Sequence, residues 1–476
     1  MAQITQAQYN TSKQTIRNVY IRVNLLNFNY LTIDSFSGNV IGGSLASDAN
    51  SNMRNTCDMT LVVTDSSFDV QAEGKIWLDR LIQVFIGVED MRTGEVAWTN
   101  KGIFLINQPT YSFDAKTNTM TFQGVDLMGL MTGLRGGMLT DSYIIPQGSN
   151  VRDAIIACLK ENGFNKYIVS ECTNVDGTIQ NVPYDIQHDA GDSWWDVLES
   201  LQSILPNYQM YFDIDGIFHY EVIPYRANEQ IRMSDDIWVQ NVTGESVSYD
   251  FESVKNSVKV LGKTHDIQYY PSTQTVSGGT LTLTIGALSE VKAGVMIGFT
   301  PPADMATAVS LNVNNNGAKP LKDSSGDQIT VLSKDVYYCA LYVGDDNYWM
   351  FLGHNQAVGE WKDNNPDSPF YIGNPAGEIK IVLYGDDYEN IMSDELAVAR
   401  AKWEIWQRCR LNDTVQLTTV PIYWAEVNWM VSYTSRGGDT ANQYLITSIQ
   451  TDLSPTGTQT YELVRYYPYY DENDIL

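Results

Sequence analysis

Short alternating runs of apolar and polar residues dominate the first part of the chain. Between residues 59 and 131 the runs are MTLVVT, KIWLDRLIQVFIGVED, VAWTNKGIFLI and TNTMTFQGVDLM. Polar turn material such as RTGE at 92–95 and DAKTN at 114–118 separates them. Regularly spaced short strands with polar turns are typical of a β-sandwich or β-barrel. Residues 1–140 are therefore predicted to form a compact β domain.

Helical spacing replaces this alternation after residue 140. In the segment 149–162 the apolar residues of one helical face are Val151, Ala154, Ile155, Cys158 and Leu159. Ser149 or Asn150 can cap the start of this helix, and Gly163 stands where a left-handed C-cap belongs.

A second helix is predicted from Asp192 to Leu205, capped by Asp192 or Ser193 and stopped by Pro206. Its apolar stripe consists of Trp194, Leu198, Leu201 and Leu205. The following segment, 208–224, alternates and turns at Asp215-Gly216, which predicts a hairpin. Residues 141–240 should therefore be a small α+β domain.

The last part of the chain is predicted to be a β domain with an insertion. Residues 266–370 are rich in Ser, Thr, Gly and Asn, with runs such as TLTLTIG and VSLNVN, and we expect an inserted accessory β module there. Residues 241–265 and 371–476 should form the second β domain, with one helix at 393–409 packed on it. Ser393 is the expected N-cap of that helix, and the expected stripe is Leu396, Ala399, Trp403 and Trp406.

The charge balance argues against nucleic-acid binding. Asp and Glu total 57 against 30 Lys and Arg, a formal net charge of -27, while only 18% of the residues are charged. Nucleic-acid binding needs a basic footprint, which is missing. The acidic surface can serve solubility, or it can let DNA pass without sticking.

The sequence shows neither a targeting signal nor a disulfide framework. There is no run of 18 apolar residues, so no membrane span is expected. The start, MAQITQAQYN, lacks the features of a secretory signal. Five cysteines without a CxxC pair fit folding in a reducing cytoplasm.

A search for reactive motifs gives no catalytic, cofactor-binding or metal-binding residue. The four histidines lie far apart, and HExxH, GxSxG and phosphate-loop motifs do not occur. His188 with Asp189 and Asp192 fits a polar loop better than a site. Asp213 and Asp215 fit a hairpin turn, although they also resemble half of a calcium loop. Carboxylates are numerous, so a glycosidase pair stays open.

Three segments resemble the bacteriophage baseplate hub, or tail-tip hub, family. They are TNKGIFLINQPTYSFDAKTNTMTFQGVDLMGLM, then DSWWDVLESLQSIL with YQMYFDIDGIFHYE, and ELAVARAKWEIWQRCRLNDTVQLTTVPIYWAEVNWMVSY. In the insertion, MIGFTPPADMATAVSLNVNNNGAKPLKD and YWMFLGH resemble β modules of phage tail fibres. Together with the patterns above, the resemblance implies a mainly β fold with α+β. It would contain two tube-like β-barrel or sandwich domains, a small α+β domain and the inserted β module.

The resemblance also implies a role and partners. Such hubs are non-enzymatic, and three chains would form a pseudo-six-fold ring that joins the tail tube to the tip and lets DNA pass. The implied partners are two further copies, tail-tube or distal tail proteins, a tape-measure protein, and tip, spike or fibre proteins. The chain would reside in the virion, at the tail tip, after assembly in the host cytoplasm.

Two alternatives stay open. The first is a carbohydrate-binding adhesin, in which Tyr338, Tyr348 and Trp349 stack on a host surface glycan; the alternative role of these rings is packing. The same choice holds for six other tryptophans, for which packing is favoured: Trp194, Trp195, Trp403, Trp406, Trp424 and Trp429. The second alternative is a cell-wall hydrolase, for which the chain leaves no room after its last strand.

Overall fold

A computed structural model describes residues 4–465, apart from 36–39, 73, 115, 173–179, 183–184, 206–207, 223–230, 324–325, 345–346, 386–387, 390, 439 and 455. The described chain is mostly β, with twenty-seven strands and five α-helices, so the predicted mainly β fold with α+β is confirmed. No helix of the described residues is long and apolar enough to cross a membrane.

The first β domain is an antiparallel sheet in the order β3-β4-β7-β6-β5-β1-β2. Alternate side chains of these strands enclose an apolar core that includes Val23, Val84 and Phe104. The strands are β1 (Val19–Leu26), β2 (Thr32–Ser35), β3 (Val40–Asp48), β4 (Asn55–Val62), β5 (Leu81–Glu89), β6 (Val96–Phe113) and β7 (Asn118–Val125).

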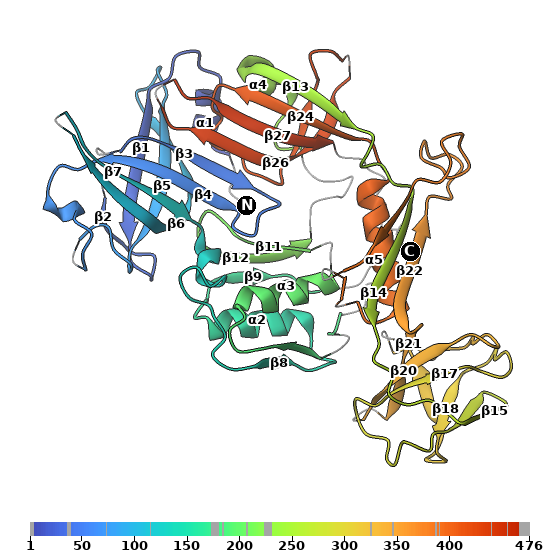
Figure 1. Ribbon diagram of the computed structural model, residues 1–476. Helices are drawn as coiled ribbons and strands as arrows, with labels where there is room; N and C mark the ends of the chain where they lie inside the picture. Colours follow the sequence, from blue (N-terminus) through green and yellow to red (C-terminus); the bar gives the residue numbers. More distant parts are fainter. Residues whose placement is uncertain are drawn as a thin grey trace.

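The second β domain continues the same sheet. Its order is β13-β24-β27-β26, with β25 paired to β26, and β26 pairs with β3 of the first domain. The result is one twelve-stranded sheet, which fills the upper part of Figure 1. Its elements are α4 (Asp235–Asn241), β13 (Val242–Asp250), β24 (Asn412–Thr419), β25 (Met430–Tyr433), β26 (Asn442–Asp452) and β27 (Gln459–Arg465).

The α+β unit lies below the first β domain in Figure 1. It holds β8 (Tyr143–Ile145), α2 (Val151–Glu161), β9 (Tyr167–Val169), β10 (Ile186–His188), α3 (Trp194–Ile204), β11 (Tyr208–Phe212) and β12 (Phe218–Val222). The predicted face of α2 is confirmed, because its five predicted residues are the buried ones, with Asn150 as N-cap. Ser193 caps α3, and Gly216 turns the predicted hairpin with φ +72°. Pro206 lies outside the described residues.

A small sheet connects the second β domain to the insertion. Its order is β22-β14-β23, from β14 (Ser257–Thr264), β22 (Gln356–Lys362) and β23 (Lys380–Leu383). Helix α5 (Asp394–Arg408) packs against β14 and β22. Strand β22 lies in the range predicted for the insertion, whereas its partner β14 lies in the range predicted for the second β domain. The predicted boundaries between the insertion and the second β domain therefore stay a proposal.

The predicted stripe of α5 is wrong in part. Ser393 caps the helix as predicted, but Ala399 is exposed. The face that meets the small sheet contains Ala397, Ala401 and Ile405. The two alanines let the helix lie close to β22. Trp403 is buried on another side of the helix, against Met430 of the second β domain, so α5 lies between the small sheet and that domain.

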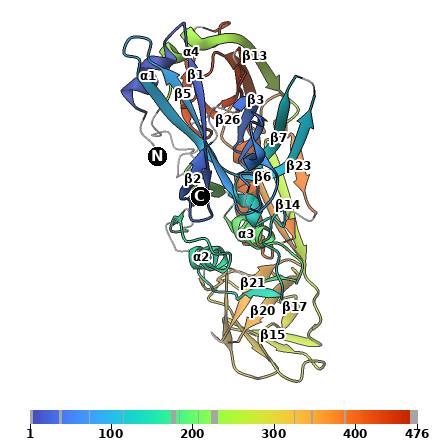
Figure 2. The same ribbon diagram turned by 90° about the vertical axis from the view of Figure 1, so that its left-hand side faces the viewer.

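The inserted module is a seven-stranded sheet with its own apolar core. Its strands are β15 (Thr273–Ser277), β16 (Thr280–Thr284), β17 (Met296–Phe299), β18 (Ser310–Val313), β19 (Lys319–Lys322), β20 (Tyr338–Val343) and β21 (Tyr348–Gly353). The chain enters and leaves it side by side, because Thr264 pairs with Gln356. Both ribbon views place the module at one end of the molecule (Figures 1 and 2).

Candidate assembly site

The junction between the two β domains is built from a backbone ladder and is surrounded by polar contacts. Five residue pairs join β26 to β3 in antiparallel register, from Ser448↔Asp48 to Asp452↔Ser44. The bond from the Ala49 amide to the Thr447 carbonyl, at 2.8 Å, continues the ladder beyond β3. Residues far apart in the sequence therefore share one backbone hydrogen-bond network.

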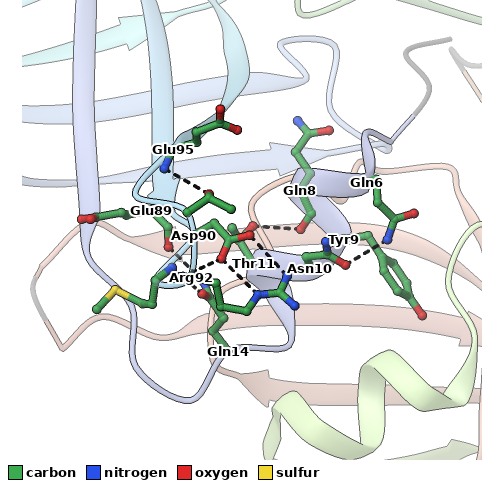
Figure 3. Close-up of polar contacts among 12 residues, drawn as sticks. Gln6, Gln8, Tyr9, Asn10, Thr11, Gln14, Glu89, Asp90, Arg92 and Glu95 are labelled. Carbon is green, nitrogen blue, oxygen red and sulfur yellow. Dashed lines mark hydrogen bonds and ion pairs between the residues drawn. The ribbon is translucent and has the colours of Figure 1, made fainter.

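The N-terminal clasp, residues 5–17, crosses this junction. Its helix α1 (Gln6–Ser12) begins with a capping box between Thr5 and Gln8. On the first β domain, the side-chain amide of Gln14 donates to the Glu89 carbonyl at 3.0 Å, and the backbone amide of Met91 donates to Gln14 Oε1 at 2.7 Å. Figure 3 shows Gln14 beside the turn from Glu89 to Glu95. The clasp is thus anchored to the β5–β6 turn.

The other side of the clasp holds the second β domain. Tyr9 and Lys13 both donate to Asp236 of α4 at 2.7 Å. Hydrogen bonds from Lys13, Ser234 and Tyr9 hold the pKa of Asp236 well below its usual range. Arg17 donates to the Pro421 carbonyl, the Ser12 carbonyl and Asn241 Oδ1. One short segment therefore binds both domains.

Two cations, the half-buried Lys101 and the buried Arg54, lie where the domains meet. Lys101 of β6 donates to the Tyr423 carbonyl of the second β domain at 2.9 Å, and burial lowers the pKa of its amine. Arg54 donates to Gln209 of the α+β unit at 2.8 Å. The same Gln209 oxygen accepts from Asn428 of the second β domain at 2.6 Å. Buried charges keep such positions only when they are well paired, so these contacts fix the relative placement of three units.

A network of aromatic and charged side chains around His219 extends from Arg54. The guanidinium lies 3.5 Å from the ring centroid of Tyr211, which stacks on His219 at 5.0 Å. Burial disfavours the charged form of His219, but the hydrogen bond with Asp213 at 3.0 Å and the Glu221 carboxylate at 3.8 Å outweigh it and raise its pKa to about 9. His219 is therefore a cation at neutral pH that supports the α+β unit.

The structure does not bring together the three residues predicted to contact a glycan. Trp349 is 1% exposed and belongs to the module core, where it packs 5.0 Å from Tyr342. Tyr338 packs at the margin of that core, whereas Tyr348 packs on the other face of the sheet. Tyr348 lies opposite Val343, five residues along β20 from Tyr338 and thus about 17 Å away. The burial of Trp349 favours its packing role.

The other histidine and aspartate residues noted in the sequence make contacts that stabilise the fold. His188 contacts Asp192 and Ser200, at 3.2 and 3.0 Å, which fastens the predicted polar loop to α3. Asp213 accepts from the backbone amides of Asp215 and Ile217, as a turn residue does. Within the described ranges, no group of three or more His, Cys, Asp or Glu could hold a metal ion.

The tryptophans predicted to pack mostly do so in pairs with other rings. Trp194 packs against Tyr143 at 4.7 Å. Trp403 pairs with Trp406 at 4.8 Å, and Trp424 pairs with Trp429 at 6.0 Å. These contacts agree with a role in packing.

A cavity of about 360 Å³ opens on the second β domain. Its wall carries Glu245, Asp413 and Arg465 among other residues. Burial raises the pKa of Asp413, and Arg465 at 3.4 Å opposes that shift. The mixed charges suit a small polar group, and the cavity lies apart from the clasp.

Sequence reasoning missed the clasp and the two cations Arg54 and Lys101. The capping box TQAQ at 5–8 is a recognisable helix start and could have revealed α1. Nothing in the local sequence marks Arg54 or Lys101, because their partners lie far away along the chain.

Comparisons with known proteins agree with this architecture. A family model described as a domain of unknown function (DUF5048) matches residues 367–470, and no curated protein matches the sequence. The tail protein from Neisseria meningitidis MC58 is similar over 96% of this chain and 99% of its own, with TM-score 0.51 and 10% identity. The 43 kDa tail protein of prophage MuSo2 from Shewanella oneidensis is similar over 95% and 99%, with TM-score 0.51 and 12% identity. The chain thus has the fold of these tail proteins, which confirms the predicted resemblance at the level of the fold.

Proposed function

We propose that this chain is a structural hub of a phage tail. The observation that carries the proposal is the shared fold, which extends over nearly the whole of this chain and of two tail proteins. A structural role, not a catalytic one, also suits the junction, where most polar groups are used to hold domains together.

The finer proposal concerns assembly. Two β domains per chain, joined in one sheet, would give six in a ring of three copies, matching a six-fold tube. The ring would join the tail tube or distal tail proteins to the tip, with a tape-measure protein and tip, spike or fibre proteins as further partners. The net charge of -27 would limit the sticking of DNA passing through it. The chain would assemble in the host cytoplasm and reside in the virion.

The test uses a phage or prophage that encodes this chain. Disrupting its coding region should yield particles without functional tail tips, and supplying the chain in trans should restore them. Antibody labelling under the electron microscope should place the chain at the end of the tail tube. Intact, infectious tails assembled without the chain, or labelling elsewhere, would count against the proposal.

A second candidate function belongs to the inserted module. It has its own core and lies at one end of the molecule, and the chain enters and leaves it at one strand pair (Figure 1). We propose that it recognises a host surface glycan through Tyr338 or Tyr348, which are half-buried and lie on different faces. Tyr338→Ala and Tyr348→Ala would be compared on a glycan array with the unaltered chain. Unchanged binding in both variants, or no binding by the unaltered chain, would rule out this role.

A further inference from the structure

The cavity of the second β domain opens where the sheet of that domain curls back on itself. Glu245 of β13 accepts hydrogen bonds from the hydroxyls of Tyr433 and Ser435. It also accepts from the backbone amide of Arg436 at 3.0 Å. Since Tyr433 ends β25, at the other end of this part of the sheet, side chains close the gap between β13 and β25. Glu245 and Ser435 also line the cavity of about 360 Å³, a volume within the range of about 300–1,000 Å³ that is typical of ligand pockets.

Asp413 of β24 is a buried carboxylate with one oxygen unused. It lines the cavity and is 3% exposed. Its Oδ2 accepts from Tyr444 at 3.5 Å and from Arg465 at 3.4 Å, and both distances are long for a hydrogen bond. Its Oδ1 has no hydrogen-bond partner among the described residues. A buried acceptor without a partner costs free energy, so a ligand that donates to Asp413 would be stabilised in the cavity.

The charges around the cavity are already compensated, which disfavours an ion as the ligand. Arg465 contacts Asp413 and also donates to Asn442 Oδ1 at 3.0 Å. The carboxylate of Glu245 accepts three hydrogen bonds. An anion in the cavity would be repelled by Glu245 and Asp413, and a cation would be repelled by Arg465. A neutral ligand with hydroxyl groups avoids both repulsions, and each hydroxyl can donate as well as accept.

The rim of the cavity offers an exposed aromatic ring and open space. Tyr249 lines the cavity and is 58% exposed. Thr440 lines it as well and is exposed. Nothing lies within 4 Å of a Cβ built at Gly437, so the rim is open at that point. A sugar ring suits such surroundings, because its C–H face can pack on an aromatic ring while its hydroxyls bond to polar groups.

We propose that this cavity binds one neutral sugar ring, with a sugar hydroxyl donating to Asp413 and the C–H face of the ring packed on Tyr249. Thr440 would bond to a second hydroxyl. All the lining residues belong to the second β domain, so the site is separate from the glycan role proposed for Tyr338 and Tyr348 of the module. The inference goes beyond the hub function and does not depend on it.

Ligand-observed NMR titrations of the full chain test the site, with glucose, galactose, mannose and N-acetylglucosamine as probes. At least one of these sugars should bind. Asp413→Asn should weaken that binding about tenfold, because a hydrogen bond to a charged acceptor is lost. The amide oxygen of the new side chain would stay beside the donor Arg465, and the amide nitrogen, which cannot accept, would replace Oδ1.

A second variant covers the case in which Asp413→Asn does not fold. Tyr249→Ala removes an exposed ring and should weaken sugar binding about fivefold. The matched control is Tyr384→Ala, which removes a tyrosine that is 72% exposed and does not line the cavity. The control should bind as the unaltered chain does. A chain with both Tyr338→Ala and Tyr348→Ala should also bind normally, since the module is not the site.

Hydrogen exchange locates the bound sugar. The backbone amides of residues 435–438 should exchange more slowly when the sugar is present. Acetate and methylammonium serve as charged probes of similar polarity. Failure of all four sugars to bind, tighter binding of either ion, equal losses in Tyr249→Ala and Tyr384→Ala, or unchanged exchange at 435–438 would overturn the inference. Because tail assembly is not measured, none of these results would count against the proposed hub function.

Discussion

Single residues at close contacts set how the helix and sheet layers meet. Gly359 of β22 faces the backbone of α5, and a Cβ built there would lie 2.1 Å from the carbonyl carbon of Ala397. Sequence patterns found the caps Asn150, Ser193 and Ser393, because a cap depends on neighbours three residues away. They could not find the need for Gly359, because its neighbour is remote in sequence.

Gly359→Ala should lower the free energy of unfolding by about 3 kcal/mol, because backbone, not a flexible side chain, must move. Gly286→Ala is the matched control, since nothing lies within 4 Å of a Cβ there. Urea unfolding followed by tryptophan fluorescence measures both. Equal effects of the two changes would contradict the close packing of α5 on β22.

The raised pKa of His219 makes stability depend on pH. Below pH 6.5 the ring is protonated in both the folded and unfolded states, and its full contribution is present. As pH rises from 6.5 to about 9, the unfolded state loses the proton first, and the contribution is lost.

His219→Gln should therefore cost about 2 kcal/mol near pH 6 and progressively less toward pH 9. The difference in unfolding free energy between the two proteins, measured in urea across this range, checks the prediction. His188→Gln serves as a control in the same unit. A His219→Gln deficit that does not change with pH would contradict the ion pairing.

Among the elements, the N-terminal clasp is short but bonds to both β domains. Helices α1 and α4 have seven residues each, too few to show a helical period, and only the start of α1 carries a capping box as a signal. The face of α5 was misjudged because its tryptophans dominate the pattern, although alanines face the sheet. Longer elements with full periodicity, such as α2, were predicted well.

Arg17→Ala should destabilise the chain by about 2 kcal/mol, because three acceptors at the domain junction lose a charged donor. Lys292→Ala is the control, since Lys292 pairs at the surface with Glu290 and such pairs contribute little. Chemical denaturation compares the two. A loss from Lys292→Ala as large as that from Arg17→Ala would argue against the clasp.

For the whole molecule, local sequence patterns could not show how distant segments of the chain connect. The β3–β26 junction joins residues 44–48 to 448–452, and no local pattern relates them. The small sheet was missed for the same reason, because β14 pairs with both β22 and β23 across long separations. The resemblance to hub proteins supplied the architecture that periodicity alone could not.

The module should be removable as a unit. Replacing residues 266–354 by Asn-Gly would join His265 to Asn355, whose backbone groups already bond at 2.8 Å, through a tight turn. We expect the remaining body to keep its oligomeric state and to melt within about 4 °C of the full chain. Calorimetry and ultracentrifugation measure this. Aggregation, or loss of the cooperative transition, would show that the module supports the body.

The side-by-side entry and exit of the module carries an evolutionary consequence. For the rest of the chain, a domain that the chain enters and leaves at one strand pair is equivalent to a long hairpin loop. Lengthening a loop adds little entropic cost. Genetic exchange at the Thr264–Gln356 pair could replace the module with a domain of another size or specificity, while the strands of the remaining body kept their pairing. The module could thus change during evolution without a change in the rest of the fold.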